Sequence, residues 1–105
     1  MARPAPEPPA QPLTRDMLTR AAEMIKCLGH PLRLRLVEGL EAGELSVTAL
    51  QEYTGAPQAQ VSQQLAALKA RGIVDCRREG AFVYYRITEP RVHSILNCVR
   101  ACDRP

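Results

Sequence analysis

The chain has 105 residues, of which 46% are hydrophobic and 24% are charged, and its formal net charge is +3. This length allows one domain with a modest core, for which a second copy of the chain is an expected partner. The chain has no apolar run of about 18 residues, and its N-terminus is rich in proline rather than hydrophobic. We therefore expect no transmembrane helix, no secretory signal, no membrane partner and a cytoplasmic location.

The N-terminal segment, residues 1–12, contains five prolines and almost no large apolar side chain. Such a segment cannot bury a core, so we expect a disordered tail, although a proline-binding partner could also dock there. The folded domain is therefore predicted over residues 13–105. Its first helix is expected over Leu13–Leu28, with Thr14 as the N-cap and Gly29 ending it in a left-handed turn.

Three further helices are predicted in the first two thirds of the chain. One spans Pro31–Glu41, and a short one spans Val47–Tyr53 with Ser46 as its N-cap. After a turn that contains Gly55, the next helix spans Pro57–Arg71. Two helices joined by such a short, glycine-containing turn are typical of a helix-turn-helix, in which the second helix is the recognition helix.

The helix over Pro57–Arg71 has two unlike faces. Val61, Leu65 and Leu68 form one apolar stripe. On composition alone, the polar face is best interpreted as solvated. The alternative is contact with base edges and phosphates in a DNA major groove, for which amides and hydroxyls are suited. The candidate residues are Gln58, Gln60, Ser62, Gln63, Gln64 and Lys69.

Charge and the following strands favour the DNA interpretation. Residues 1–56 contain six Lys/Arg and seven Asp/Glu, whereas residues 57–105 contain eight Lys/Arg and four Asp/Glu. Strands are predicted over Ile73–Arg78 and Phe82–Ile87, joined by a short turn with a glycine. A hairpin with arginines directly after a recognition helix is typical of a wing, which contacts the DNA backbone or minor groove. The wing candidates are Arg77, Arg78 and Gly80.

The last predicted helix begins after Thr88, its expected N-cap, and carries apolar residues at helical spacing. So small a domain leaves such a helix little to cover, so we expect it to form a dimer interface with the first helix; the alternative is packing within its own domain. The predicted fold is mainly α with a two-stranded β-wing, in the order α-α-α-α-β-β-α. This is a winged helix-turn-helix homodimer.

Four segments together resemble the ArsR/SmtB family of winged helix-turn-helix repressors: LGHPLRLRLVEGL (28–40), ELSVTALQEYTG (44–55), VSQQLAALKARGIV (61–74) and RREGAFVYYRI (77–87). The resemblance implies a homodimer that binds an imperfectly palindromic DNA operator and is released by an inducer. It implies that Gln58, Gln60, Ser62 and Gln63 face the major groove, and that Arg77, Arg78 and Gly80 lie near the backbone. Many members have histidine where this chain has Gln64.

Two inducer sites of the family are not matched in this sequence. The arsenic-sensing cysteine cluster of the third helix is replaced by residues 47–50, which contain no cysteine. The zinc site formed by paired C-terminal helices needs Asp and His pairs, and this chain offers only His93 and Asp103 there.

The cysteines offer another inducer site. Cys98 and Cys102 are four residues apart and share one face of the last helix, and Arg100 and Arg104 nearby are expected to favour thiolates. Thiolates bind As(III), Sb(III) and other soft metals, and Cys27 is the expected third ligand, from the same chain or the partner. Alternatively, Cys27 and one of this pair form a redox or persulfide switch. Cys76 is best interpreted as a small buried side chain.

No nucleophile–base pair and no phosphate-binding glycine loop is visible in the sequence, so we do not expect an enzyme. DNA binding needs no cofactor in this interpretation, and the inducer is the only ligand expected. A third hypothesis is a protein-interaction module that uses the winged fold without binding DNA, but the polar face and the wing arginines argue against it.

Overall fold

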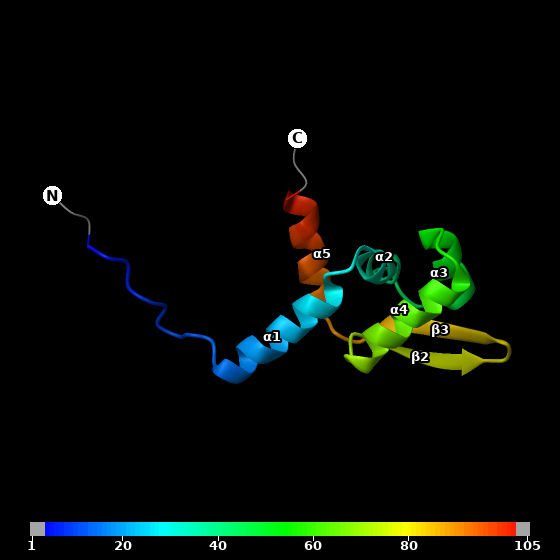
Figure 1. The fold of residues 1–105 in the computed structure, drawn as a ribbon, viewed down its shortest axis with the longest axis horizontal. Helices are drawn as coiled ribbons and strands as arrows, with labels where there is room; N and C mark the ends of the chain where they lie inside the picture. The colour runs from blue at the N-terminus through cyan, green and yellow to red at the C-terminus, as the bar shows by residue number, and fades with distance from the viewer. Residues whose placement is uncertain (1–3, 103–105) are drawn as a thin grey trace.

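The computed structural model describes residues 4–102, which form five helices and three strands (Figure 1). Residues 4–14 contain neither helix nor strand and extend away from the helices. The elements in chain order are α1 (Arg15–Leu28), α2 (Pro31–Gly39), β1 (Leu45–Ser46), α3 (Val47–Thr54), α4 (Gln58–Ala70), β2 (Val74–Glu79), β3 (Phe82–Ile87) and α5 (Arg91–Cys102).

Two predicted N-caps are confirmed by hydrogen bonds. The Thr14 hydroxyl oxygen accepts from the Met17 N–H at 3.1 Å, and the Ser46 hydroxyl oxygen accepts from the Ala49 N–H at 3.0 Å. Gly55 ends α3 with a φ of 72°, a left-handed conformation that favours glycine. The helix-turn-helix of α3 and α4 is therefore built by short-range signals in the sequence.

The expected ends of two other helices are wrong. Gly29 has a φ of −75°, not a left-handed one, because the chain continues directly into α2, where the His30 imidazole accepts from the Leu32 N–H at 3.2 Å. Thr88 does not cap α5: its hydroxyl donates to the Gly72 carbonyl at 3.0 Å, and the Glu89 carboxylate accepts from the Arg91 N–H instead. Both residues are used to join neighbouring elements.

The sheet has three antiparallel strands in the order β1-β3-β2, rather than the two predicted. The additional strand β1 is only two residues long, too short for an alternating pattern, and pairs Leu45 with Tyr85 and Ser46 with Tyr84. Strands β2 and β3 pair over their full length, from Val74↔Ile87 to Glu79↔Phe82. β1 therefore attaches the base of the wing to the start of α3.

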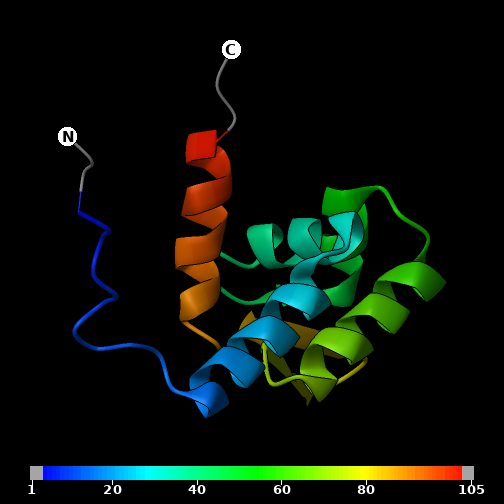
Figure 2. The ribbon, with the colours of Figure 1, turned by 60° about the vertical axis from the view of Figure 1, so that its left-hand side comes forward.

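Helix α4 lies at the centre of the core, where Val61, Leu65 and Leu68 are fully buried. Helices α1 and α5 lie together on the other side of the molecule from the wing (Figures 1 and 2). They keep large apolar side chains exposed, such as Ile25 at 62% and Val99 at 50%. Within residues 4–102, no helix is long and apolar enough to cross a membrane.

Candidate nucleic-acid interface and cysteine sites

The polar face of α4 is presented to solvent because its opposite face is packed in the core. The four residues expected in the major groove, Gln58, Gln60, Ser62 and Gln63, are all exposed. Gln58 and Ser62 also line a groove of about 200 Å³ that α4 forms with α3 and the tip of the wing. A surface of amides and hydroxyls at the mouth of a groove can donate to and accept from base edges.

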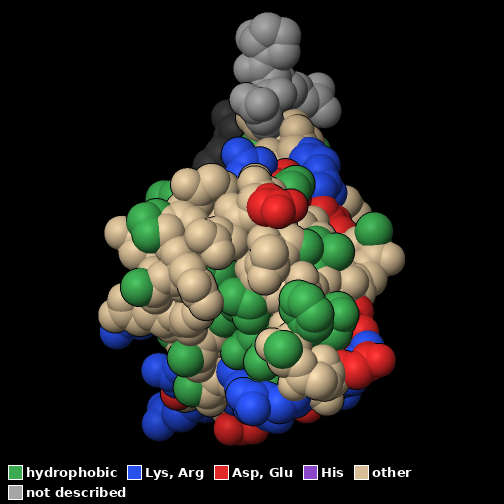
Figure 3. Space-filling model, turned by 90° about the vertical axis from the view of Figure 1, so that its right-hand side faces the viewer, with side chains coloured by type: hydrophobic (Ala, Val, Ile, Leu, Met, Phe, Trp, Pro, Cys, Tyr) green, Lys and Arg blue, Asp and Glu red, His purple; other side chains and the backbone are tan. Residues whose placement is uncertain are grey.

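The groove contains two residues that the sequence analysis missed, Thr48 from α3 and Phe82 from β3. Both are exposed, Phe82 to 52%. Figure 3 views the molecule from the side of the wing tip and α3, where hydrophobic side chains lie in the middle of the face and basic ones gather along its lower edge. An aromatic residue directly after the Gly80-Ala81 turn is the signal in the sequence that could have indicated this surface.

Gln64 differs from its neighbours because it is half-buried against α2. Its Oε1 accepts a hydrogen bond from the Arg33 Nε at 2.7 Å. The same guanidinium donates through Nη1 to the Cys27 carbonyl oxygen at 3.1 Å. Arg33 therefore joins the end of α1, the start of α2 and the middle of the recognition helix, a role that the sequence did not reveal.

The two wing arginines, Arg77 and Arg78, differ in whether their side chains are paired with carboxylates. Arg77 forms two hydrogen bonds to the Glu44 carboxylate, at 2.8 and 2.6 Å, and a third to Glu79. Its guanidinium also lies 4.8 Å from the centre of the Tyr84 ring. Hydrogen bonds to these carboxylates raise the pKa of Arg77, and the Arg77 hydrogen bond lowers the pKa of Glu44. Arg77 therefore holds β1 against the wing.

Arg78 is exposed on the opposite face of β2, and within residues 4–102 no hydrogen bond or ion pair engages its side chain. It is thus the better placed of the two arginines for a phosphate. Gly80 turns the wing with a φ of 60°. Lys69 donates to the Cys76 sulfur at 3.3 Å, and this hydrogen bond raises the pKa of Lys69.

The four cysteines are free and lie in different surroundings. Cys98 and Cys102 are exposed on α5, whereas Cys27 is buried. Cys76 is only half-buried, so its interpretation as a core side chain is wrong. Arg100, expected to favour the thiolates, instead binds the Glu41 carboxylate, which lowers the pKa of Glu41. Arg104 and Asp103 lie outside the described residues.

The sulfur atoms do not assemble into a metal site within one chain. Among residues 4–102, no three His, Cys, Asp or Glu side chains lie close enough together to hold a metal ion. Cys27 faces a pocket formed with α4, while Cys98 lines a different pocket beside α5. The expectation of Cys27 as a third ligand within the same chain is therefore not met, and its arrangement across a dimer stays a prediction.

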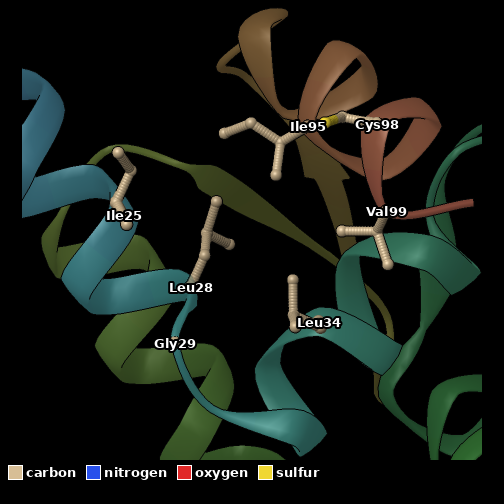
Figure 4. A pocket seen from close by; sticks show the side chains of 7 residues that line it. All are labelled: Ile25, Leu28, Gly29, Leu34, Ile95, Cys98 and Val99. Atoms are coloured by element: carbon tan, nitrogen blue, oxygen red, sulfur yellow. The ribbon is translucent and has the colours of Figure 1, made fainter. Parts of the chain in front are cut away.

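The pocket beside Cys98 is an apolar groove of about 330 Å³ between α1, α2 and α5 (Figure 4). Its sides are formed by Ile25 and Leu28 on α1 and by Ile95 and Val99 on α5, with Leu34 between them. Because these side chains are apolar and all but Leu28 are at least partly exposed, the groove is suited to another apolar surface.

Known proteins are similar to this chain in sequence and in fold. A family model of a helix-turn-helix domain matches residues 28–77. The biofilm growth-associated repressor of Xylella fastidiosa is 41% identical over 87 residues, covering 80% of this chain and 76% of that protein. The crystal structure of the transcriptional repressor BigR from Xylella fastidiosa has a TM-score of 0.77 and 39% identity, covering 89% of this chain and 99% of that one.

A solution structure of a homodimeric winged helix-turn-helix DNA-binding domain from Mycobacterium bovis, a possible ArsR-family regulator, has a TM-score of 0.71 and 34% identity. The matched region covers 88% of this chain and 87% of the Mycobacterium bovis domain. Fold and sequence together define a winged helix-turn-helix transcriptional regulator. The chain belongs to the ArsR/SmtB family of transcriptional repressors. Its relatives are DNA-binding repressors and not enzymes, as the sequence predicted.

Proposed function

We propose that the chain is a homodimeric repressor that binds an imperfectly palindromic operator through α4 and the wing, and that thiol chemistry at Cys98 and Cys102 releases it. The observation that carries the DNA-binding part is the exposed row of Gln58, Gln60, Ser62 and Gln63 on α4, together with the exposed Arg78 on the wing. The first groups distinguish bases and the arginine contacts phosphate.

Dimerisation is supported by the apolar surface that α1 and α5 leave exposed. Ile25 and Val99 remain at least half exposed, and they flank the apolar groove. A homodimeric relative with the same fold is consistent with a second copy covering this surface. A dimer presents two recognition helices, as a two-fold operator requires.

The inducer is proposed to act on α5. Cys98 and Cys102 are both exposed, and one helical turn separates them, so two sulfur ligands can face one As(III) or Sb(III) ion. In a dimer built on α5, a third sulfur has to come from the partner chain. Because no three-ligand group forms within residues 4–102 of one chain, oxidation or persulfidation of the same thiols is the second candidate.

DNA binding is tested by fluorescence anisotropy with operator-like and scrambled duplexes at several salt concentrations. We expect tighter binding to the operator and a loss of affinity for both duplexes as salt rises. Absence of salt-sensitive binding would contradict the repressor function and favour the protein-interaction module.

The two inducers are separated by adding As(III) or an oxidant to the reduced protein–operator complex. The variant Cys98→Ser/Cys102→Ser is expected to lose the response to As(III), while Cys76→Ser serves as a matched control. A double variant that still responds to As(III) would contradict a metalloid site at this pair. A wild type that responds only to oxidant would support the second candidate.

A further inference from the structure

A second pocket lies between α1, α2 and the C-terminal half of α4, and it differs in chemistry from the apolar groove. Its volume is about 370 Å³, within the range of small-molecule sites. Its charged residues are Lys26, Arg33 and Arg71 against the single carboxylate of Glu23. The small side chains of Ala67 and Ala70 leave the space open on the α4 side.

The cations of this pocket are only weakly satisfied by the protein. Within residues 4–102, no hydrogen bond or ion pair engages the Lys26 side chain. Arg71 has one ion pair, to Glu23 at 3.6 Å, and both side chains are about half exposed, so water screens that pair. Arg33 uses Nε and Nη1 for Gln64 and Cys27, and its Nη2 stays available.

The pocket is expected to stay open in the proposed dimer. Successive residues of a helix are rotated by about 100°, which places Glu23 and Cys27 on the side of α1 opposite Leu18 and Ile25. Leu18 and Ile25 are the exposed apolar residues expected to meet the partner. Helix α1 therefore separates the two surfaces, and in Figure 2 it runs beside α4 at the front of the molecule.

We propose that this pocket binds a small anion carrying carboxylate or phosphate groups, and that the bound anion weakens operator binding. Two guanidinium groups and an ammonium that converge on one small cavity match the charge and hydrogen-bonding geometry of such anions. None of these three cations is among the residues proposed to contact DNA.

The regulatory half of this inference rests on the proposed repressor function, and Arg33 supplies the connection. An anion that accepts from the Nη2 of Arg33 draws this guanidinium toward the pocket, and this weakens the 2.7 Å hydrogen bond from its Nε to Gln64, which fixes α4 against α2. The anion also neutralises positive charge close to the recognition helix, which lowers the attraction to DNA. Both effects have the same sign, and we expect about a fivefold loss of operator affinity.

Binding is tested without DNA, by amide NMR spectra of the full chain titrated with inorganic phosphate or malonate, with chloride at matched ionic strength as the reference. We expect saturable shifts at Ala67 and Ala70 with a midpoint of about 1 mM. Lys26→Gln and Arg71→Gln should abolish saturation. Arg15→Gln, which removes an equal charge at the far end of α1, should not. Shifts that do not saturate, or an equal loss in Arg15→Gln, would overturn the site.

Operator anisotropy with the same anions then tests the coupling. An anion that saturates the NMR shifts but leaves operator affinity unchanged would overturn the regulatory half alone, while a chain that binds the anion but no DNA would overturn the repressor function and not the site. If Lys26→Gln and Arg71→Gln weaken DNA binding in anion-free buffer more than Arg15→Gln does, these cations contact DNA phosphates. That result would overturn the coupling through the Arg33–Gln64 hydrogen bond in favour of direct competition between the anion and DNA.

Discussion

Helices α4 and α5 are both amphipathic, yet they complete their apolar faces in different ways. The stripe of α4 is fully buried at Val61, Leu65 and Leu68. On α5, Val92 is fully buried, but Val99 is half exposed at the edge of the apolar groove. A helix whose apolar face is fully buried within its own chain presents only its polar face to a partner. A helix whose apolar face stays partly exposed presents an apolar surface to a partner. This difference distinguishes the proposed DNA surface on α4 from the proposed dimer surface on α5.

The largest effect is expected on stability, from Leu65→Ala in the fully buried apolar face of α4. The substitution leaves a cavity in the core and should lower the free energy of unfolding by about 2–5 kcal/mol. Urea unfolding followed by circular dichroism measures it. Ala66→Gly on the exposed side of α4 is the control, with an expected cost of about 1 kcal/mol from helix propensity alone. Equal costs would mean that α4 does not organise the core.

Val99→Asp should disrupt the proposed dimer contact through the partly exposed apolar face of α5, without unfolding the monomer. A carboxylate at a half-exposed position stays solvated in the monomer, but it would be desolvated in an apolar interface. We expect the dimer dissociation constant to rise about tenfold or more, measured by sedimentation equilibrium. The matched control is Asn97→Asp, which adds the same charge on the exposed side of α5. If Val99→Asp leaves the assembly unchanged, the dimer uses another surface.

Gln63→Ala tests the polar face of α4. Loss of an amide that binds a base edge should cost about 1–3 kcal/mol for the operator and little for scrambled DNA. Arg78→Ala is the matched comparison, because removing a cation that binds phosphate should weaken the binding of both duplexes alike and reduce the salt slope by about 1. If both variants lose selectivity to the same extent, α4 and the wing do not divide these roles.

Short-range signals predicted most of the fold. Thr14, Ser46 and Gly55 mark helix ends through groups only a few residues away. Helical spacing in α4 was sufficient to predict which residues are buried there. Strand β1 was missed because two residues carry no period, and its pairing depends on β3, about forty residues later.

The candidate site was less predictable because its charges are paired over long distances in the chain. Arg77 is bound by Glu44, which is 33 residues earlier, and Gln64 is bound by Arg33, which is 31 residues earlier. Neither pairing leaves a local pattern, so Arg77 and Arg78 looked equivalent in the sequence. The position of Cys27 could not be predicted for the same reason, because it depends on how α1 packs beside α4.

The smallest effect is expected from Glu44→Gln, which tests whether Arg77 is a structural residue of the wing. The Arg77 hydrogen bond lowers the pKa of Glu44 below its ordinary value of 4.5, so this carboxylate stabilises the fold above that pH and loses its contribution as the pH falls through the lowered pKa. The stability difference between wild type and Glu44→Gln should therefore be small near neutral pH and vanish in acid. Glu52→Gln, on the exposed side of α3, is the control. Operator and scrambled DNA should both bind slightly more tightly to Glu44→Gln, because Arg77 is released near the phosphates. Weaker binding to both would mean that the ion pair contributes by fixing the wing, and that the position of the wing matters more than its charge.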